Sequence, residues 1–318
     1  MRSASRWIYV AVGCVVLLFS GLVYAWSVLS GPIAAEFPRW TTAQLSLTFT
    51  IVMSFFCLGG LTCGALSARI SPRIFLWISA LLFLAGFLLT ASMRSLPMLY
   101  VGFGVVCGLA SGFSYNAVLG TVGAWFPDKQ GLASGAMLMG FGGGTMLLSP
   151  VVTTMLGALG WRMTFGALGA VFVVLVGAGA FIMKLPTPEY VRPLLEKARQ
   201  NATVAAVDMT GSQMVRTPTF WVFMVYLMLV TCGGLALISQ AVPAAMELLM
   251  GAGAGAGASG AAAAGAGVSA ALPEAEALML ATAAMGSVSA MNGLGRLING
   301  FIWDKFGYRV CLTWIAVA

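Results

Sequence analysis

The chain has 318 residues, of which 60% are hydrophobic and 8% are charged, and its mean hydropathy is +0.97. Soluble domains carry roughly one-quarter charged residues, so this composition excludes a water-soluble fold and indicates a protein embedded in a lipid bilayer. The formal net charge is +7, but the basic residues are scattered along short polar segments instead of clustered on one face, so we expect no nucleic-acid partner.

The first predicted span covers residues 7–30 and follows two arginines. A cleaved signal peptide is the alternative, but its apolar region has only roughly 7 to 15 residues, whereas this run is long enough to cross a hydrocarbon core of about 30 Å. We therefore expect a retained helix that carries Tyr24 and ends at the helix-breaking pair Gly31 and Pro32.

Five more spans complete a predicted six-helix N-terminal bundle over residues 1–185. Apolar runs place these spans at residues 44–66, 74–93, 98–122, 132–156 and 163–185. The next segment, residues 186–218, is polar and carries charges of both signs. We interpret it as a solvent-exposed cytoplasmic central loop that joins two halves.

A partial C-terminal bundle is predicted over residues 219–318, with spans at residues 220–243 and 278–303 and a ninth span that begins at Val310. Residues 251–271 between the first two are rich in Gly and Ala, which leave little side-chain surface to bury in lipid. We expect an outer loop there, with a silk-like strand or an additional span as alternatives. The predicted fold class is an all-α polytopic membrane protein with about eight full spans.

The basic residues predict the orientation, because cytoplasmic loops carry an excess of Lys and Arg. With a cytoplasmic N-terminus, only Arg39, Arg94 and Arg162 of the 16 basic residues would face outside, and Arg296 would lie within a span. We therefore predict a multi-pass protein of the cell membrane with its N-terminus in the cytoplasm.

Arg296 is the strongest candidate for a functional residue, because it is the one charged residue in the span at 278–303. An ionisable side chain at that depth is costly and by default marks a functional site. Its planar fork of donors suits a carboxylate. The alternative is that Arg296 snorkels toward the cytoplasm, since it precedes Asp304 by only eight residues, about 12 Å of helix.

A loop pattern occurs twice, six spans apart. The second copy reads G-x-x-x-D-K-x-G-x-R and forms a predicted turn with Gly300, Asp304, Lys305, Gly307 and Arg309. The first copy follows the second span and retains Gly64, Arg69 and Arg73. It has Ala68 where the second copy has Asp304, so it lacks the acid of a charge-based gate. A cytoplasmic anchor with a tight turn is the simpler reading of both copies.

This spacing resembles the loop signature of the major facilitator superfamily, between its second and third helices and between its eighth and ninth. A second stretch, W-F-P-D-K-Q-G-L-A-S-G at residues 125–135, contains Asp128 and Lys129 and continues to a glycine-rich run at 140–144. It resembles the fourth-to-fifth helix region of the oxalate/formate antiporter and monocarboxylate transporter families. We expect the glycines to permit close helix packing rather than to bind a nucleotide, because they lie in an apolar helix with no strand before it.

The resemblance covers essentially the whole chain and implies two six-helix bundles with a binding site near the midplane between them. A complete member has twelve spans, so the chain is expected to be truncated early in its ninth. The family uses a substrate-binding arginine on the eighth helix, which corresponds to Arg296. Its first and fourth helices line the cavity, which makes Tyr24 and Tyr115 further candidates, although ordinary packing is an equal alternative for both.

The sequence shows no paired carboxylates in the spans and no nucleophile with a base, so we expect no enzyme. There is no histidine, and the six cysteines lack metal-type spacing, so we expect neither a metal site nor a cofactor. We predict secondary active transport of small organic anions, such as oxalate, formate or monocarboxylates, by alternating access, with exchange and proton-linked symport both open. The alternatives are a major facilitator of other specificity, for drugs or sugars, and a non-transporting truncated membrane protein.

Overall fold

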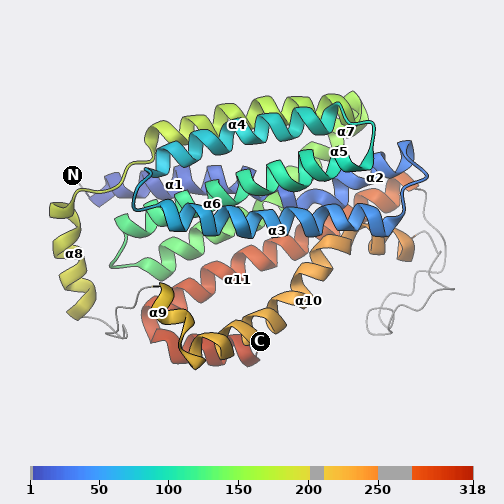
Figure 1. Ribbon diagram of the computed structural model, residues 1–318. Helices are drawn as coiled ribbons and strands as arrows, with labels where there is room; N and C mark the ends of the chain where they lie inside the picture. Colours follow the sequence, from blue (N-terminus) through green and yellow to red (C-terminus); the bar gives the residue numbers. More distant parts are fainter. Residues whose placement is uncertain (1–2, 201–210, 250–273, 318) are drawn as a thin grey trace.

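The computed structural model describes residues 3–200, 211–249 and 274–317 (Figure 1). All regular secondary structure in these ranges is helical, and five continuous helical stretches there are long and apolar enough to cross a membrane, which confirms the predicted all-α polytopic fold. In chain order the elements are α1 (Ser3–Ser20), the 3-10 segment η1 (Gly21–Ala25), α2 (Trp26–Glu36), α3 (Thr42–Leu66), α4 (Pro72–Ala91), α5 (Leu96–Leu99), the π-helical segment η2 (Tyr100–Cys107), α6 (Gly108–Trp125), α7 (Gln130–Ile182), α8 (Pro188–Gln200), α9 (Gly211–Val215), α10 (Pro218–Leu249) and α11 (Glu274–Val317).

The first span differs from its prediction at its end. The elements α1, η1 and α2 form one continuous apolar stretch, Arg6–Glu36, and Pro32 lies inside α2 instead of ending it. The predicted end at Gly31 and Pro32 is therefore wrong. Proline is tolerated inside membrane helices because neighbouring groups satisfy the backbone carbonyl that it leaves free.

Two glycines divide the longest helical stretches. Gly160 in α7 has φ 73° and ψ 164°, and Gly307 in α11 has φ 80° and ψ 175°. A positive φ of this kind strains any residue with a Cβ, so glycine is required at both sites. Gly160 separates the two spans predicted at 132–156 and 163–185, and Gly307 supplies the turn that was predicted near the end of the chain.

Aromatic side chains fill the core of the N-terminal part. Phe83, Phe87, Phe103, Phe165 and Phe172 are all buried, and the ring centroids of Phe87 and Phe172 lie 5.0 Å apart. Helix association in lipid depends on such close packing, since the lipid tails are as apolar as the side chains themselves. The core fixes the N-terminal helices against which α10 and α11 lie.

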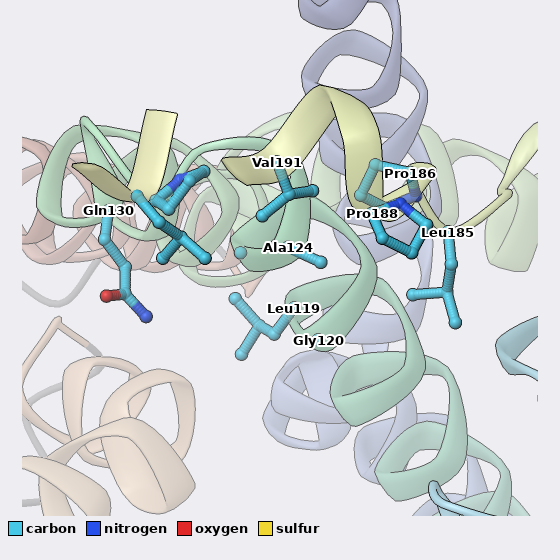
Figure 2. A pocket seen from close by; sticks show the side chains of 11 residues that line it. Leu119, Gly120, Ala124, Gln130, Leu185, Pro186, Pro188 and Val191 are labelled. Carbon is cyan, nitrogen blue, oxygen red and sulfur yellow. The ribbon is translucent and has the colours of Figure 1, made fainter. Parts of the chain in front are cut away.

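Two helices occur within the segment predicted as a solvent-exposed central loop. Helix α8 stands across the end of the bundle that carries the N-terminus, which we call the N-side (Figure 1). Its Tyr190 ring lies 5.2 Å from that of Trp125, and Val191 and Leu195 line a cavity of 630 Å³ with Leu119 of α6 (Figure 2). The apolar side of α8 thus covers the end of α6.

The Gly/Ala-rich loop predicted at 251–271 lies outside the described residues.

Helix α11 is the element that joins the C-terminal part to the rest. It runs alongside α7 over much of its length, and α10 contacts both α11 and α2 (Figure 1). The contact between α7 and α11 positions the candidate site.

Candidate functional site

Glycines bring α7 and α11 into backbone contact near the N-side. A Cβ added at Gly300 would overlap the carbonyl oxygen of Gly131, and one added at Gly135 would lie 2.8 Å from the carbonyl oxygen of Arg296. Gly300 therefore lies inside α11 and not in the predicted turn. Its missing side chain serves close helix packing, which a sequence pattern alone does not distinguish from a turn.

The Arg296 side chain points away from the N-side, toward the middle of the membrane. Its Nη1 donates a hydrogen bond to the Leu138 carbonyl at 3.2 Å, and its Nε donates to Asn292 Oδ1 at 3.3 Å. The guanidinium carbon lies 3.4 Å from the position that a Cβ on Gly142 would take. Both Leu138 and Gly142 lie farther along α7 than Gly135, which contacts the Arg296 backbone. This direction is opposite to the one that snorkelling toward the N-side requires.

The structure brings the three predicted substrate residues together. The Arg296 guanidinium is hydrogen-bonded to the hydroxyl group of Tyr24, in η1, and lies close enough to that of Tyr115, in α6, to act on it electrostatically. The Phe141 ring lies between the two phenols, with its centroid 5.2 Å from that of Tyr24 and 4.9 Å from that of Tyr115. Arg296 thus lies beside two phenol hydroxyls, whose oxygens can accept from the guanidinium, and an aromatic wall.

Serine hydroxyls tie together the helices that carry the two tyrosines. Ser20 and Ser114 are hydrogen-bonded at 2.8 Å, and Ser111 Oγ donates to the Ser20 carbonyl at 3.0 Å. Ser20 directly precedes η1, where a 3-10 segment interrupts the α-helical ladder. Mid-helix 3-10 turns often mark functional sites. The local break therefore positions Tyr24 against α6 and α7.

Sequence reasoning missed Asn292 and Ser289 as members of this site. Ser289 Oγ donates to the Gly142 carbonyl at 2.5 Å and is hydrogen-bonded to Thr145. Residues 289, 292 and 296 follow the i, i+3, i+7 spacing of one helix face. That spacing was present in the sequence and could have shown that the arginine belongs to a polar stripe.

The two loop copies contact opposite ends of α7. Asp304 accepts hydrogen bonds from the backbone N–H groups of Gly131 at 2.8 Å and Leu132 at 2.7 Å. Arg73 donates to the carbonyls of Met183 at 3.0 Å and Phe181 at 2.6 Å, at the other end of the same hairpin. The acid therefore meets the positive end of a helix dipole and the arginine meets a negative end.

The other residues predicted for the loop motif are spread over the N-side. Lys305 Nζ lies 5.5 Å from the Phe301 ring centroid and 5.2 Å from that of Phe306. Gly64, Arg69, Lys129 and Arg309 are exposed. None of these four lies among the residues that surround Arg296.

Among the described residues, the ion-pair partner of Asp128 is Arg6. Its carboxylate oxygens accept from Arg6 Nη1 at 2.8 Å and Nη2 at 3.0 Å, and the side chains are 9% and 13% exposed. The Arg6 guanidinium also lies 4.5 Å from the Phe126 ring centroid. Asp128 therefore anchors the start of the first span within the N-terminal part.

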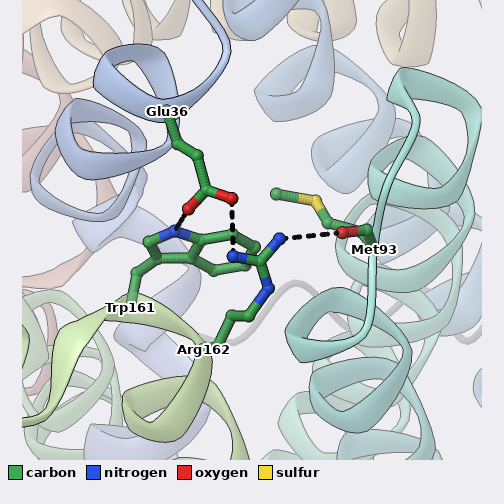
Figure 3. A network of polar contacts seen from close by, with 4 residues as sticks. All are labelled: Glu36, Met93, Trp161 and Arg162. Carbon is green, nitrogen blue, oxygen red and sulfur yellow. Dashed lines mark hydrogen bonds and ion pairs between the residues drawn. The ribbon is translucent and has the colours of Figure 1, made fainter.

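A second polar network lies at the opposite side of the bundle (Figure 3). Glu36 accepts hydrogen bonds from Trp161 Nε1 at 2.5 Å and Arg162 Nη1 at 2.6 Å, and Arg162 Nη2 donates to the Met93 carbonyl at 3.5 Å. This network follows directly after the Gly160 turn. It holds the end of α2 to the start of the sixth span.

A cavity of 520 Å³ opens beside the contact between α7 and α11. Its lining includes Gln130, Ser134, Arg296, Asn299 and Trp303. Within the described ranges, no three or more Cys, Asp or Glu side chains gather as a metal site would require.

The fold is a multi-pass helical bundle, and a cation lies within the membrane where its two parts meet. This arrangement is typical of membrane transport proteins. The family comparison agrees: residues 8–318 match the Major Facilitator Superfamily, and the chain belongs to that family.

Among curated relatives, the chain is 28% identical over 252 residues to the oxalate:formate antiporter of Oxalobacter formigenes, a match that covers 78% of this chain and 57% of the relative. It is 27% identical to the uncharacterized MFS-type transporter YhjX of Escherichia coli (strain K12), over 77% of this chain and 59% of the relative. It is 32% identical to monocarboxylate transporter 11 of Homo sapiens, over 39% of this chain and 26% of the relative. The chain thus spans less than three-fifths of the length of the first two of these relatives.

Proposed function

We propose that this protein is a secondary active transporter of small organic anions, with carboxylates such as oxalate, formate or monocarboxylates as its substrates. The observation that carries the proposal is the direction of Arg296, which points to the middle of the membrane and toward the Tyr24 hydroxyl, with Tyr115 within electrostatic range. The names of the relatives, an oxalate:formate antiporter and monocarboxylate transporters, support the same substrate class.

Arg296 has donors to spare for an anion. A guanidinium has five N–H donors, and two of its nitrogens are engaged by Leu138 and Asn292. Arg296 makes no ion pair with any carboxylate among the described residues, where ion pairs join Arg6 to Asp128 and Arg162 to Glu36. A carboxylate substrate supplies the missing negative charge in a planar form that the guanidinium can bind with two parallel hydrogen bonds.

The unpaired cation also bears on the transport cycle. An empty site would carry a bare charge through a dehydrated cavity, whereas a loaded site is close to neutral, so the loaded form reorients at lower cost. This favours exchange or proton-linked symport over a leak. The bond between Asp304 and the start of α7 acts as a closure of the N-side that must open in each cycle.

We place the protein in the cell membrane, as a transporter and not an enzyme. The excess of basic residues on the N-side favours a cytoplasmic N-terminus. Gly64, Arg69, Arg73, Asp128 and Lys129 then belong to the cytoplasmic face together with the second loop copy.

The test is anion exchange by the protein expressed from its complete gene and reconstituted in proteoliposomes. Vesicles loaded with unlabelled oxalate or formate should take up the labelled anion. Arg296→Gln should lower uptake by about 30-fold or more, because losing one partner of a buried charge pair costs about 2 kcal/mol or more. Arg296→Lys, which keeps the charge without the fork, is the matched control and should retain part of the uptake.

Two results would count against the proposal. Equal uptake by Arg296→Gln and the parent would remove the arginine from the site. A parent that moves neutral sugars or lipophilic drugs, but no carboxylate, would contradict the substrate class.

A further inference from the structure

Three polar residues of α11 face α7 along one stripe. Ser289 donates to the Gly142 carbonyl at 2.5 Å, and Arg296 Nη1 donates to the Leu138 carbonyl at 3.2 Å. Asn292 lies between them and does not share their role: its Oδ1 accepts from Arg296 Nε at 3.3 Å. Asn292 is therefore the member of the stripe that holds the arginine.

This contact decides which edge of the guanidinium is free. A guanidinium can meet a carboxylate along the edge formed by Nε and one terminal nitrogen, or along the edge formed by the two terminal nitrogens. Because Asn292 occupies Nε, the first edge is closed. The terminal edge stays available, because Nη1 has a second N–H beyond the one that it donates to the Leu138 carbonyl.

Holding Nε also reduces the cost of ordering the side chain. An arginine side chain carries about 2 kcal/mol of rotamer entropy, much of which a bound anion would otherwise have to remove. The Leu138 bond restrains one terminal nitrogen, and the Asn292 bond restrains the middle of the chain. With both in place the fork is set before the substrate arrives, which favours tight binding.

We propose that Asn292 is a positioning residue for the substrate site, which orients Arg296 so that a carboxylate binds the edge formed by its two terminal nitrogens. This inference rests on the proposed function and deepens it. Asn292 acts by its neutral oxygen, because an acid in the same position would pair with Arg296 and compete with the substrate.

The test compares three substitutions at Asn292 with a control on the same helix outside the stripe, using exchange kinetics in proteoliposomes and thermal unfolding. Asn292→Ala should raise KM by about 10-fold with little change in the maximal rate, because it removes a hydrogen bond to a charged group. Asn292→Gln keeps a neutral acceptor and should restore most of the affinity. Ser287→Ala removes a hydrogen bond to the Ala283 carbonyl on the exposed side of the same helix and should leave KM unchanged.

Asn292→Asp separates positioning from a merely structural bond. If Asn292 only stabilises the helix pair, the aspartate should strengthen the bond to Arg296 and transport should persist. Positioning predicts the opposite, a stable protein that no longer exchanges carboxylates.

Unchanged KM in Asn292→Ala, or parent-like transport by Asn292→Asp, would overturn the inference while leaving the proposed function intact. A parent that exchanges no carboxylate would overturn both. Carboxylate exchange by the parent protein therefore distinguishes failure of this inference from failure of the proposed function.

Discussion

The Asp304 carboxylate accepts a hydrogen bond from the backbone N–H of Gly131, a residue 173 positions earlier, at a distance of 2.8 Å. The second carboxylate oxygen accepts from Leu132 at 2.7 Å. Both N–H groups belong to the first turn of α7, where they have no partner within the helix. An acid from the C-terminal part thus serves as the N-terminal cap of a helix in the N-terminal part, and it can do so only while the N-side is closed.

Asp304→Ala should shift the protein toward a state that is open on the N-side. Loss of a helix cap costs about 1 kcal/mol, and one to two kcal/mol is a factor of roughly 5 to 30 in population. Spin labels at the exposed residues Arg69 and Lys305 would report the change as a longer distance. Glu276→Gln, which removes an exposed acid near the start of α11, is the control. Identical distance distributions in Asp304→Ala and the parent would rule out the closure.

Gly300→Ala should separate α7 from α11, because the added Cβ would overlap the Gly131 carbonyl. Overpacking of this kind costs about 1 to 3 kcal/mol. Gly295→Ala is a matched control on the same helix, since a Cβ there has no neighbour within 4 Å. Thermal unfolding should show a lower midpoint for Gly300→Ala alone. Equal midpoints would mean that the helix pair can move apart freely.

Tyr24→Phe and Tyr115→Phe should each weaken carboxylate binding while preserving the aromatic contacts with Phe141. A hydrogen bond to a charged group is worth about 1.5 to 3 kcal/mol, so KM should rise by about 10-fold or more. Tyr100→Phe removes a hydroxyl that donates to the Gln44 carbonyl and should leave KM unchanged. If all three variants behave alike, the hydroxyls do not contact the substrate.

The two ion pairs should differ strongly in their effect on stability. Asp128→Asn leaves the buried Arg6 charge without its partner, which should cost about 3 to 5 kcal/mol. Glu36→Gln disturbs a pair whose side chains are 40% and 45% exposed, and it should lower the stability much less, because water screens an exposed pair (Figure 3). Thermal unfolding of the two variants in the same detergent compares them directly. A larger loss of stability for Glu36→Gln than for Asp128→Asn would contradict the expectation that the buried pair matters more.

Hydropathy was sufficient to place the spans of the N-terminal part, because lipid demands long apolar helices and this part of the chain supplies them. It failed at Pro32, where a residue that ends soluble helices is accommodated inside a membrane helix. The loop pattern located Gly307 correctly, since a positive φ needs glycine, but it gave no means to see that Gly300 packs against Gly131.

The candidate site was predictable only where its residues form a pattern within one segment of the sequence. A charge within an apolar span, as at Arg296, is visible in one segment of sequence, and Asn292 could have been found one helical turn before it. The Asp304 contact with Gly131 joins segments 173 residues apart, and no local pattern encodes such a partner. The roles of Arg296, Tyr24 and Tyr115 in binding stay predictions that the variants above would test.

The ion pair between Arg6 and Asp128 spans 122 positions of the chain, so its two members are never synthesised together. At translation rates of about 5 to 20 residues per second, Asp128 follows Arg6 by roughly 6 to 24 seconds. During that interval the Arg6 charge has no acid to meet and is best accommodated among headgroups and water on the side where the chain began. The first span thereby keeps one orientation in the membrane while the ribosome makes the second, third and fourth spans. The ion pair with Asp128 then stabilises in the finished protein an orientation that was set during synthesis.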